Sequence, residues 1–203
     1  MLRVCLFDMD GVIRKWSAAA IEQAEAMAGL SHGELVRIMT SVPEYEDGVV
    51  GRATFDQWCD AIEREVAVRC GAAAAHEVIA GWRLYRGDLD PAVVALIAEV
   101  RKFLPVGLLS NAHDSLTADL ALLGLTDAFD AVIGSADVGL AKPDPAIYAL
   151  AAATFKVEPH ECFFADDLAP NIESARAFGM DAVVFTSADQ LRRELQARKV
   201  LPE

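Results

Sequence analysis

The sequence predicts an α/β protein whose parallel sheet is covered by helices on both faces, with a helical insertion after the first strand. From about residue 90 onward, strand-like and helix-like segments alternate. This pattern implies right-handed crossovers between parallel strands. The strand-like segments are continuous Val, Ile, Leu and Phe runs, which are typical of strands buried on both faces. We predict a core of residues 1–14 and 88–203 and an inserted helical domain of residues 15–87.

Local signals place the core elements in chain order. A buried strand ends at Asp8 in MLRVCLFDMDG. Asp90 and Pro91 mark the start of the helix DPAVVALIAEVRKF, because Asp is a common N-cap and Pro is favoured at the first helical position. Ser187 and Gln190 form a capping box that begins the last helix. The segments between are the strand PVGLLSN, the helix HDSLTADLALLG, the strand DAVIGS, the helix DPAIYALAAATF, the strand ECFFADD, the helix PNIESARAFG and the strand DAVVFT.

The insertion contains helical signals and no convincing strand. Ser31 with Glu34 and Thr54 with Gln57 form two capping boxes, and helical periodicity runs through FDQWCDAIEREVAVRC. The stretch SVPEYEDGVVGRA has glycines and no clear periodicity, which predicts a loop that joins the helices.

The composition limits the class of protein. The 203 residues carry a formal net charge of -13, and 54% of them are hydrophobic. This charge has the wrong sign for a surface that neutralises nucleic-acid phosphates or anionic lipid, so we expect neither nucleic acid nor membrane as a partner. We expect instead a small-molecule partner and a monomer or homodimer.

Membrane and secretion signals are also missing from the sequence. No apolar run approaches the roughly eighteen residues of a membrane span, and Asp8 and Asp10 interrupt the amino-terminal apolar run. We therefore expect a cytoplasmic protein. The four cysteines form no Cys-x-x-Cys pair, so buried thiols are expected rather than a zinc site or a disulfide framework.

Polar residues gather where the predicted strands end. Ligands of open parallel sheets bind outside the carboxyl ends of the strands, so these residues are expected to share one rim. Several carboxylates together suit Mg²⁺, which takes a few carboxylates, waters and substrate phosphate as ligands. The rim residues are Asp8, Asp10, Ser110, Asn111, Lys142, Asp166 and Asp167.

The same residues resemble the motifs of a known family. FDMDGV, LLSN, the lysine of AKPDP and FADDLAPN resemble, in order, the four motifs of the haloacid dehalogenase (HAD) superfamily of hydrolases. The helical insertion resembles the cap that this family places between its first and second motifs. The resemblance spans essentially the whole chain and implies a Rossmann-like core with a small helical cap.

The resemblance implies a role for each motif residue. Asp8 would attack phosphorus to form an aspartyl phosphate. Asp10 would act as general acid and base, and its main-chain carbonyl would bind Mg²⁺. The phosphoryl oxygens would be held by Ser110, Asn111 and Lys142, and the metal by Asp8, Asp10 and Asp167, with Asp166 either a further ligand or the partner of Lys142.

Simpler roles are also open for several of these residues. Ser110 and Asn111 could cap the following helix, and Lys142 alone could be a solvated loop residue. Asp166 and Asp167 could favour the start of the helix near Pro170. A hairpin turn at Asp8 and Asp10 is disfavoured, because no strand is predicted after Gly11.

Within the family, the residues favour hydrolysis of a small phosphomonoester metabolite, with sugar phosphates among the candidate substrates. Asp10 and the paired acids of the fourth motif argue against a metal-independent haloacid dehalogenase, and a sugar-phosphate mutase would use the same core groups. The alternative of another class is a non-catalytic phosphometabolite-binding or regulatory protein.

In the cap, Arg52 could bind a second anionic group, and Trp16, Trp58 and Trp82 could line an entrance. The four histidines are expected at the surface or at helix caps, with His113 near enough to Ser110 to touch a substrate.

Overall fold

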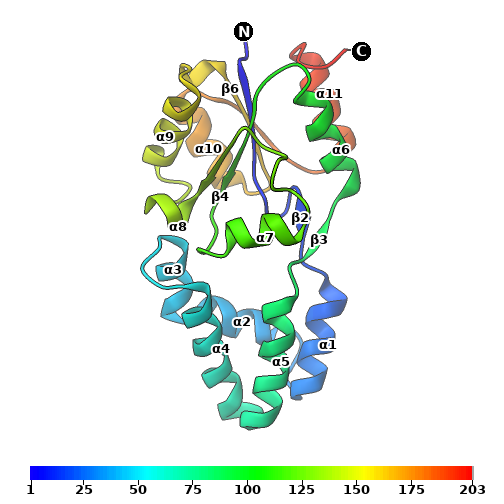
Figure 1. Cartoon of the computed structure of the whole chain (residues 1–203), viewed down its shortest axis with the longest axis vertical. Helices are drawn as coiled ribbons and strands as arrows, with labels where there is room; N and C mark the ends of the chain where they lie inside the picture. Colours follow the sequence, from blue (N-terminus) through cyan, green and yellow to red (C-terminus); the bar gives the residue numbers. More distant parts are fainter. Residues whose placement is uncertain (203) are drawn as a thin grey trace.

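Figure 1 shows the protein as a computed structural model, which describes residues 1–202. Five strands form one parallel sheet in the order β5-β4-β1-β6-β7. In β1, Phe7 lies beside Leu108 of β4 on one side and Ala165 of β6 on the other. The predicted α/β fold with a Rossmann-like parallel sheet is confirmed. The strands are β1 (Val4–Phe7), β4 (Val106–Ser110), β5 (Ala131–Gly134), β6 (Cys162–Asp166) and β7 (Asp181–Val184).

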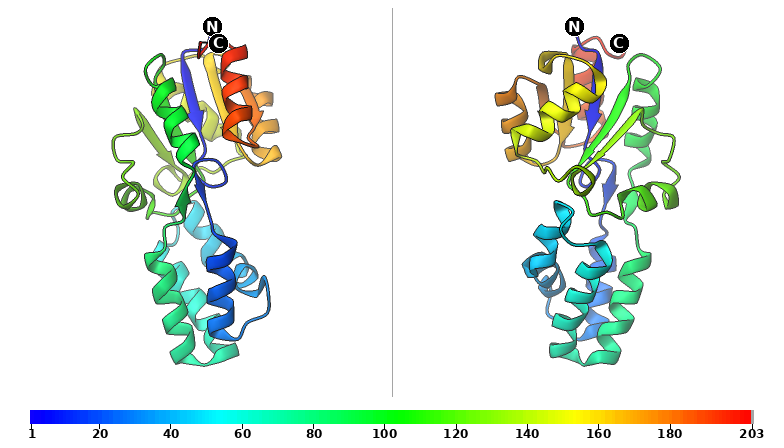
Figure 2. Two further views of the ribbon diagram at one scale, coloured as in Figure 1. Left: turned by 90° about the vertical axis from the view of Figure 1, so that its right-hand side faces the viewer. Right: turned by 60° about the vertical axis from the view of Figure 1, so that its left-hand side comes forward.

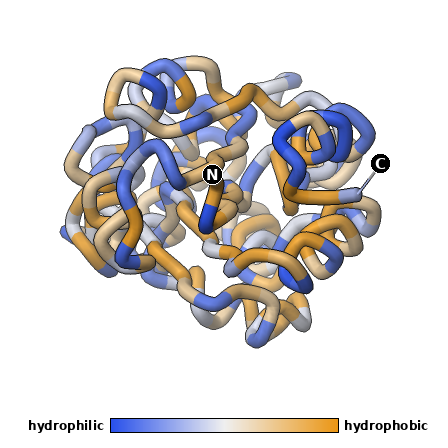
Figure 3. The backbone as a smooth tube through the Cα atoms, turned by 90° about the horizontal axis from the view of Figure 1, so that it is seen from above, coloured by the Kyte–Doolittle hydropathy of each residue, from blue (hydrophilic) through white to orange (hydrophobic). Residues whose placement is uncertain are grey.

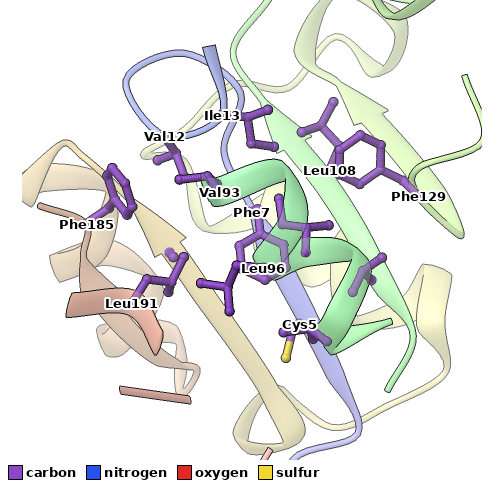
Figure 4. Packing of buried hydrophobic residues seen from close by; sticks show 14 of the residues in the cluster. Cys5, Phe7, Val12, Ile13, Val93, Leu96, Leu108, Phe129, Phe185 and Leu191 are labelled. Atoms are coloured by element: carbon purple, nitrogen blue, oxygen red, sulfur yellow. The ribbon is translucent and has the colours of Figure 1, made fainter. Parts of the chain in front are cut away.

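Helices cover both faces of this sheet. Side chains of β1 alternate between the faces, so Cys5 and Phe7 pack with Leu96 and Leu191 on one side (Figure 4), and Leu6 faces the other. The first face carries α6 (Pro91–Val100), α7 (Leu116–Leu122) and α11 (Ala188–Ala197), and the second carries α9 (Pro145–Phe155) and α10 (Ala169–Phe178). A short helix, α8 (Ser135–Val138), follows β5, and the 3₁₀ helix η1 (Pro159–Glu161) precedes β6.

The inserted helices form a second group at the end of the molecule opposite the two termini (Figures 1 and 2). They have a separate apolar cluster that includes Leu35, Ile62 and Ile79. The division into a core of residues 1–14 and 88–203 and a cap of residues 15–87 stays a prediction, which this separate cluster supports. The helices are α1 (Ala18–Ala28), α2 (Glu34–Ser41), α3 (Pro43–Val49), α4 (Phe55–Cys70) and α5 (Ala72–Leu84).

One part of the insertion differs from its predicted structure. Residues 43–49, expected to be a loop, form the helix α3, with Pro43 at its first position. Seven residues are too few to form a stable helix by propensity alone. Contacts with α2, α4 and α8 stabilise α3 instead, and these contacts leave no periodicity in the sequence.

Two short strands connect the sheet to the helical group, and neither was predicted. β2 (Arg14–Lys15) and β3 (Asp88–Leu89) pair in antiparallel fashion where the chain leaves the core and where it returns. A strand therefore does follow Gly11, but its partner is β3 rather than β1, so Asp8 and Asp10 do not form a hairpin turn. Strands of two residues are too short to show a sequence pattern.

The predicted helix starts are largely confirmed. Asp90 accepts hydrogen bonds from the backbone N–H groups of Ala92 and Val93, and Thr54 with Gln57 forms a complete capping box. Ser187 caps α11, but the Gln190 side chain bonds the N–H of Thr186 rather than that of Ser187. At α2 only half of the box forms, because Glu34 accepts from the N–H of Ser31 while Gly33 is the N-cap.

Helices at the surface have mixed polarity, as the tube viewed from above shows (Figure 3). None of the helices within residues 1–202 has the length and apolar character required to cross a membrane. Cys5, Cys59 and Cys162 are buried as expected, and burial raises the pKa of the Cys59 and Cys162 thiols to about 11.

Candidate active site

The carboxyl ends of the strands open into a cavity between the sheet and the inserted helices. The cavity has a volume of about 1050 Å³. Asp8, Asp10, Asn111, Lys142 and Asp167 line it from the core side. The structure therefore brings together most of the residues that the motifs single out.

Asp8 and Lys142 form a buried ion pair at the floor of this cavity. The Lys142 Nζ lies 2.8 Å from Asp8 Oδ1, and both side chains are almost fully buried. The N–H of Met9 donates to the same Asp8 oxygen at 2.7 Å. Burial raises the pKa of the Asp8 carboxyl, and the Lys142 ammonium only partly opposes this effect. Burial by itself lowers the pKa of Lys142, but its two carboxylate partners outweigh burial and raise it.

Asp166 is the second carboxylate that forms an ion pair with Lys142. Its Oδ2 lies 2.6 Å from Lys142 Nζ, and its Oδ1 accepts from the N–H of Leu168 at 2.8 Å. The Asn171 amide donates to both oxygens at 3.0 Å. Of the two roles open for Asp166, these contacts favour the partner of Lys142 over a metal ligand, because both oxygens already have donors.

Asp167 completes a cluster of acids. One oxygen each from Asp8, Asp166 and Asp167 lie within 4.8 Å of one another. Three carboxylates against one ammonium group leave two negative charges, and burial followed by repulsion from Asp166 raises the pKa of Asp167. Hard oxygen ligands with this excess charge fit a divalent cation such as Mg²⁺. Within this cluster, Asp8 and Asp167 are the carboxylates suited to hold it, and the predicted role of the Asp10 main-chain carbonyl as a further ligand stays a prediction.

The close approach of Asp167 requires glycine at position 11. Gly11 has φ +82°, and a Cβ atom there would lie 2.1 Å from Asp167 Oδ2. Any side chain at this position would therefore be strained and would displace the carboxylate. The glycine after Asp10 thus has a structural role in the acidic cluster.

Asp10 has a partner that the sequence did not indicate. Arg14 Nε donates to Asp10 Oδ1 at 2.7 Å and Nη2 to Oδ2 at 3.0 Å, a bidentate pair. Trp16 Nε1 adds a third hydrogen bond at 2.9 Å, and the Arg14 guanidinium stacks over the Trp16 ring. The carboxylate predicted to be the general acid and base is therefore held from the side where the chain enters the cap.

The same arginine links Asp10 to a second buried acid. Arg14 Nη1 donates to Asp119 Oδ2 at 2.9 Å, and Asp119 lies on α7. Arg86, in the segment that returns from the cap, forms an ion pair with Asp119 Oδ1 at 2.9 Å, without hydrogen-bond geometry. We call Asp10, Arg14, Arg86 and Asp119 the charged contact. Its four charges balance, and it joins the core to both chain segments that enter the cap.

Ser110 and Asn111 have different positions at the end of β4. The Ser110 Oγ is fully buried and has no hydrogen-bond partner within residues 1–202. Such an orphaned hydroxyl is expected where a bound group normally supplies the partner. The Asn111 amide donates to the Lys142 carbonyl and accepts from the Lys142 N–H, both at 2.8 Å. Asn111 therefore positions the backbone that carries Lys142.

His113 lies inside an aromatic cluster of the cap rather than at the open surface. Its ring stacks on Trp58, with centroids 4.5 Å apart, and lies beside Tyr45 and Phe55. Burial lowers the pKa of His113, although nearby Asp114 opposes this shift. A Cβ atom on Gly48 of α3 would lie 2.1 Å from the imidazole, so the ring fits only because this position is glycine. We call Tyr45, Phe55, Trp58 and His113 the aromatic contact.

The cap residues singled out in the sequence also reach the cavity. Trp16, Trp58 and Trp82 all line it, and Trp16 stacks on Trp82 at 4.9 Å. Arg52 lines it too, but its guanidinium pairs with Asp47 at 2.7 Å and is largely exposed. Its predicted role as a second anion site stays a prediction.

Sequence relatives agree with the motifs. A family model described as haloacid dehalogenase-like hydrolase matches residues 2–179. The chain is 30% identical over 214 residues to bifunctional epoxide hydrolase 2 of Mus musculus, covering 96% of this chain but 38% of that protein. It is 30% identical to phosphatase MT3486 of Mycobacterium tuberculosis, covering 92% of this chain and 88% of that one. A phosphoglycolate phosphatase of Yersinia pestis is 28% identical to the chain, and the match covers 91% of this chain and 81% of that protein.

Solved structures share the fold at low identity. A HAD family enzyme from Bacteroides thetaiotaomicron, in complex with magnesium and inorganic phosphate, superposes with a TM-score of 0.73 at 19% identity, covering 92% of this chain and 95% of that one. An L-2-haloacid dehalogenase from Xanthobacter autotrophicus superposes with a TM-score of 0.67 at 22% sequence identity. The match covers 100% of this chain and 85% of that one. The match over residues 2–179, together with motifs at the strand ends, leads to one conclusion: the chain belongs to the haloacid dehalogenase-like hydrolases.

Proposed function

We propose that the protein is a Mg²⁺-dependent hydrolase of phosphate monoesters that works through an aspartyl phosphate on Asp8. The observation that carries this proposal is the cluster of Asp8, Asp166 and Asp167, whose oxygens lie within 4.8 Å around a single lysine. A phosphate dianion would be repelled by this excess of negative charge unless a cation were present. Mg²⁺ bound there would supply that charge and orient the phosphoryl oxygens.

We infer the attacking oxygen from the contacts of Asp8. Within residues 1–202, the contacts from Lys142 and from the N–H of Met9 both go to Asp8 Oδ1, which leaves Oδ2 as the nucleophile. In the first step, the bond from Oδ2 to phosphorus forms as the bond from phosphorus to the ester oxygen breaks. Lys142 steadies the carboxylate and the phosphoryl charge, and the orphaned Ser110 hydroxyl donates to a phosphoryl oxygen.

Asp10 handles the protons of both steps. It donates a proton to the departing alcohol oxygen and then takes one from the water that attacks the phosphorus of the aspartyl phosphate. The second step releases inorganic phosphate and restores Asp8. Arg14 and Trp16 hold the Asp10 carboxylate by three hydrogen bonds, so they are positioning residues for these transfers.

The comparisons support the phosphatase proposal over dehalogenation. Two of the relatives are named phosphatases and cover most of their own length in the match. The dehalogenase likeness is at 22% identity and concerns the fold alone. The acidic cluster favours a phosphorylated substrate, because carbon–halogen cleavage does not require a cation to offset phosphate charge.

The decisive experiment is turnover of 4-nitrophenyl phosphate with Mg²⁺, with excess EDTA, and in the variant Asp8→Asn. We expect activity only with Mg²⁺, none in Asp8→Asn, and phosphate trapped on residue 8 of the parent by rapid quench. Asp189→Asn on the surface helix α11 is the matched control and should keep parental activity.

Other outcomes would identify the alternative functions. Chloride release from 2-chloropropionate without metal would indicate a haloacid dehalogenase. Interconversion of glucose 1-phosphate and glucose 6-phosphate would indicate a mutase. Binding of these esters without any turnover would indicate a non-catalytic phosphometabolite-binding protein.

A further inference from the structure

The cap side of the cavity differs in chemistry from its floor. The floor is charged, whereas the cap contributes apolar side chains from its helices and an aromatic wall, by which we mean Trp16, Trp58, Trp82 and Tyr85. We propose that the substrate is a monophosphate ester of a bulky apolar alcohol, which rests on the proposed phosphatase function. The cap residues that carry this inference are Trp16, Ile21, Val36, Val49, Val50 and Trp82.

The apolar wall has surface that the protein itself does not cover. Val36 on α2 lines the cavity and is 41% exposed, although it is a hydrophobic residue on an amphipathic helix. Ile21, Val49 and Val50 are also only partly buried. Apolar side chains around a concave site are typical of pockets that bury the apolar part of a ligand. The volume of about 1050 Å³ is far more than a phosphate group alone requires.

The charged groups of the cavity favour a substrate with one anionic group. Lys142 serves the phosphoryl position, and the other cations that line the cavity within residues 1–202 already have carboxylate partners. Glu46 adds a further negative charge to the wall. A substrate with a second phosphate or a carboxylate would therefore have to displace a carboxylate from one of these cations. The paired cations are Arg14 with Asp10 and Asp119, Lys15 with Asp90, Arg52 with Asp47 and Arg86 with Asp119.

Trp16, Trp58 and Tyr85 line the cavity, and their polar atoms already have protein partners. The Trp16 and Trp58 N–H groups donate to Asp10 and to the Met39 carbonyl. The Tyr85 hydroxyl donates to Asp88 and accepts from the N–H of Ser17. These rings therefore offer faces and edges rather than hydrogen-bonding groups. A sugar hydroxyl placed against these three rings would lose hydrogen bonds to water without replacement, whereas an apolar chain or ring loses none.

The test compares esters that differ only in the alcohol. We would measure kcat/KM with Mg²⁺ for ethyl, butyl and octyl phosphate, below any micelle concentration, beside glucose 6-phosphate and phosphoglycolate. Each buried methylene can raise kcat/KM by at most about fourfold, so we expect a rise of about 10- to 100-fold from butyl to octyl phosphate. Glucose 6-phosphate or phosphoglycolate as the better substrate would overturn the inference.

A matched pair of variants locates the effect in the cavity. Val36→Ser changes a cavity residue, and Val68→Ser changes an equally apolar cap residue that is 81% exposed on α4 and outside the cavity lining. We expect Val36→Ser to lower kcat/KM for octyl phosphate by about threefold or more, with ethyl phosphate and the Val68→Ser variant unchanged. Equal effects of the two variants, or equal effects on both esters, would contradict the inference.

The two proposals fail in distinguishable ways. If 4-nitrophenyl phosphate and ethyl phosphate are hydrolysed with Mg²⁺ but octyl phosphate is no better, the substrate inference is wrong and the phosphatase proposal stands. If no phosphate ester is hydrolysed, the phosphatase proposal is wrong. Calorimetric titration with octyl phosphate then shows whether the apolar cavity still prefers it to ethyl phosphate, and equal affinities would overturn the inference as well.

Discussion

Among the contacts between the core and the inserted helices, the charged contact and the aromatic contact differ in chemistry. The charged contact lies where the chain passes between the core and the cap. Arg14 donates hydrogen bonds to Asp10 and Asp119, and Arg86 forms an ion pair with Asp119. The aromatic contact lies on the side of α3 and α4, where His113 stacks on Trp58. The first is bidentate and almost fully buried around Arg14, and the second depends on stacking and on the absence of a side chain at Gly48.

This difference indicates how the cap is attached. Ion pairs with directional hydrogen bonds fix the geometry of Asp10 relative to the crossing strands β2 and β3. Stacked rings tolerate separation and re-formation at smaller cost, since their energy beyond area burial is about 0.5–1.5 kcal/mol. We therefore expect the charged contact to stay formed when the cap moves relative to the core, and the aromatic contact to be the one that separates. The following variants test this comparison.

The largest effect is expected from Arg14→Met, because it leaves Asp119 and Asp10 without their shared cation. Breaking a buried ion pair from one side costs about 3–5 kcal/mol. We expect this loss in the free energy of unfolding in urea. We also expect a greater loss of kcat on an alkyl phosphate than on 4-nitrophenyl phosphate, whose leaving group needs little protonation.

The control for this variant is Arg192→Met, which removes an arginine paired with Glu99 at the surface. It should change stability far less and leave the ratio of the two kcat values at its parental value. If Arg14→Met changed both esters equally, Arg14 would be structural and would not position Asp10.

Gly48→Ala should produce the next largest effect, because its new Cβ would collide with His113. Alanine favours a helix by about 1 kcal/mol over glycine, but overpacking costs about 1–3 kcal/mol. We expect the collision to displace His113 from Trp58, measured as faster hydrogen exchange in α3 and changed tryptophan fluorescence. In the double variant Gly48→Ala/His113→Ala the collision is gone, so stability should rise above that of His113→Ala. A further loss in the double variant would show that α3 itself does not accept alanine.

The imidazole of His113 should make stability depend on pH. Its pKa is lowered in the folded protein, mainly by burial, while the unfolded chain binds the proton at the ordinary pKa near 6.5. The unfolded state therefore binds more protons as pH falls below about 6.5, so acid reduces stability, by at most about 1.4 kcal/mol per pH unit. In His113→Leu this part of the slope should vanish, whereas His32→Leu, which removes an exposed ring, is the control. An unchanged slope in His113→Leu would place the acid sensitivity elsewhere.

The smallest effect is expected from Arg52→Gln, whose ion pair with Asp47 is largely exposed. Exposed pairs contribute little, so the free energy of unfolding should change by no more than about 0.5 kcal/mol. Turnover of ethyl phosphate should also stay at the parental value. A selective loss on phosphoglycolate, which has a second anionic group, would instead support the predicted anion-binding role of Arg52.

The placement of the core residues along one edge of the sheet was largely predictable, whereas the contacts of the core with the cap were not. Asp8 and Asp167 stand at the ends of buried runs, and Lys142 lies in a loop that follows another strand; parallel strands bring such ends to one edge. Arg14 and Asp119 are 105 positions apart, and the sequence carries no signal for a pair at that distance. Asp119 would be expected on the solvated face of its helix, yet it is only 6% exposed. His113 was predicted near the substrate, but its stacking on Trp58 required the cap to be in place.

By itself the sequence determined the alternation of strands and helices, the buried character of the strands and the acids at their ends, because these depend on local periodicity and on neighbouring residues. The tertiary structure alone decided the strand order, the helix α3, the pairing of β2 with β3 and the partners of Asp10. These features depend on side chains far apart in the chain that meet only when the cap packs against the core. The physical reason is that burial, ion pairing and stacking act between residues that are neighbours in space. A periodic pattern along the chain indicates which face of its helix or strand a residue occupies, but it does not indicate which distant residue that side chain contacts.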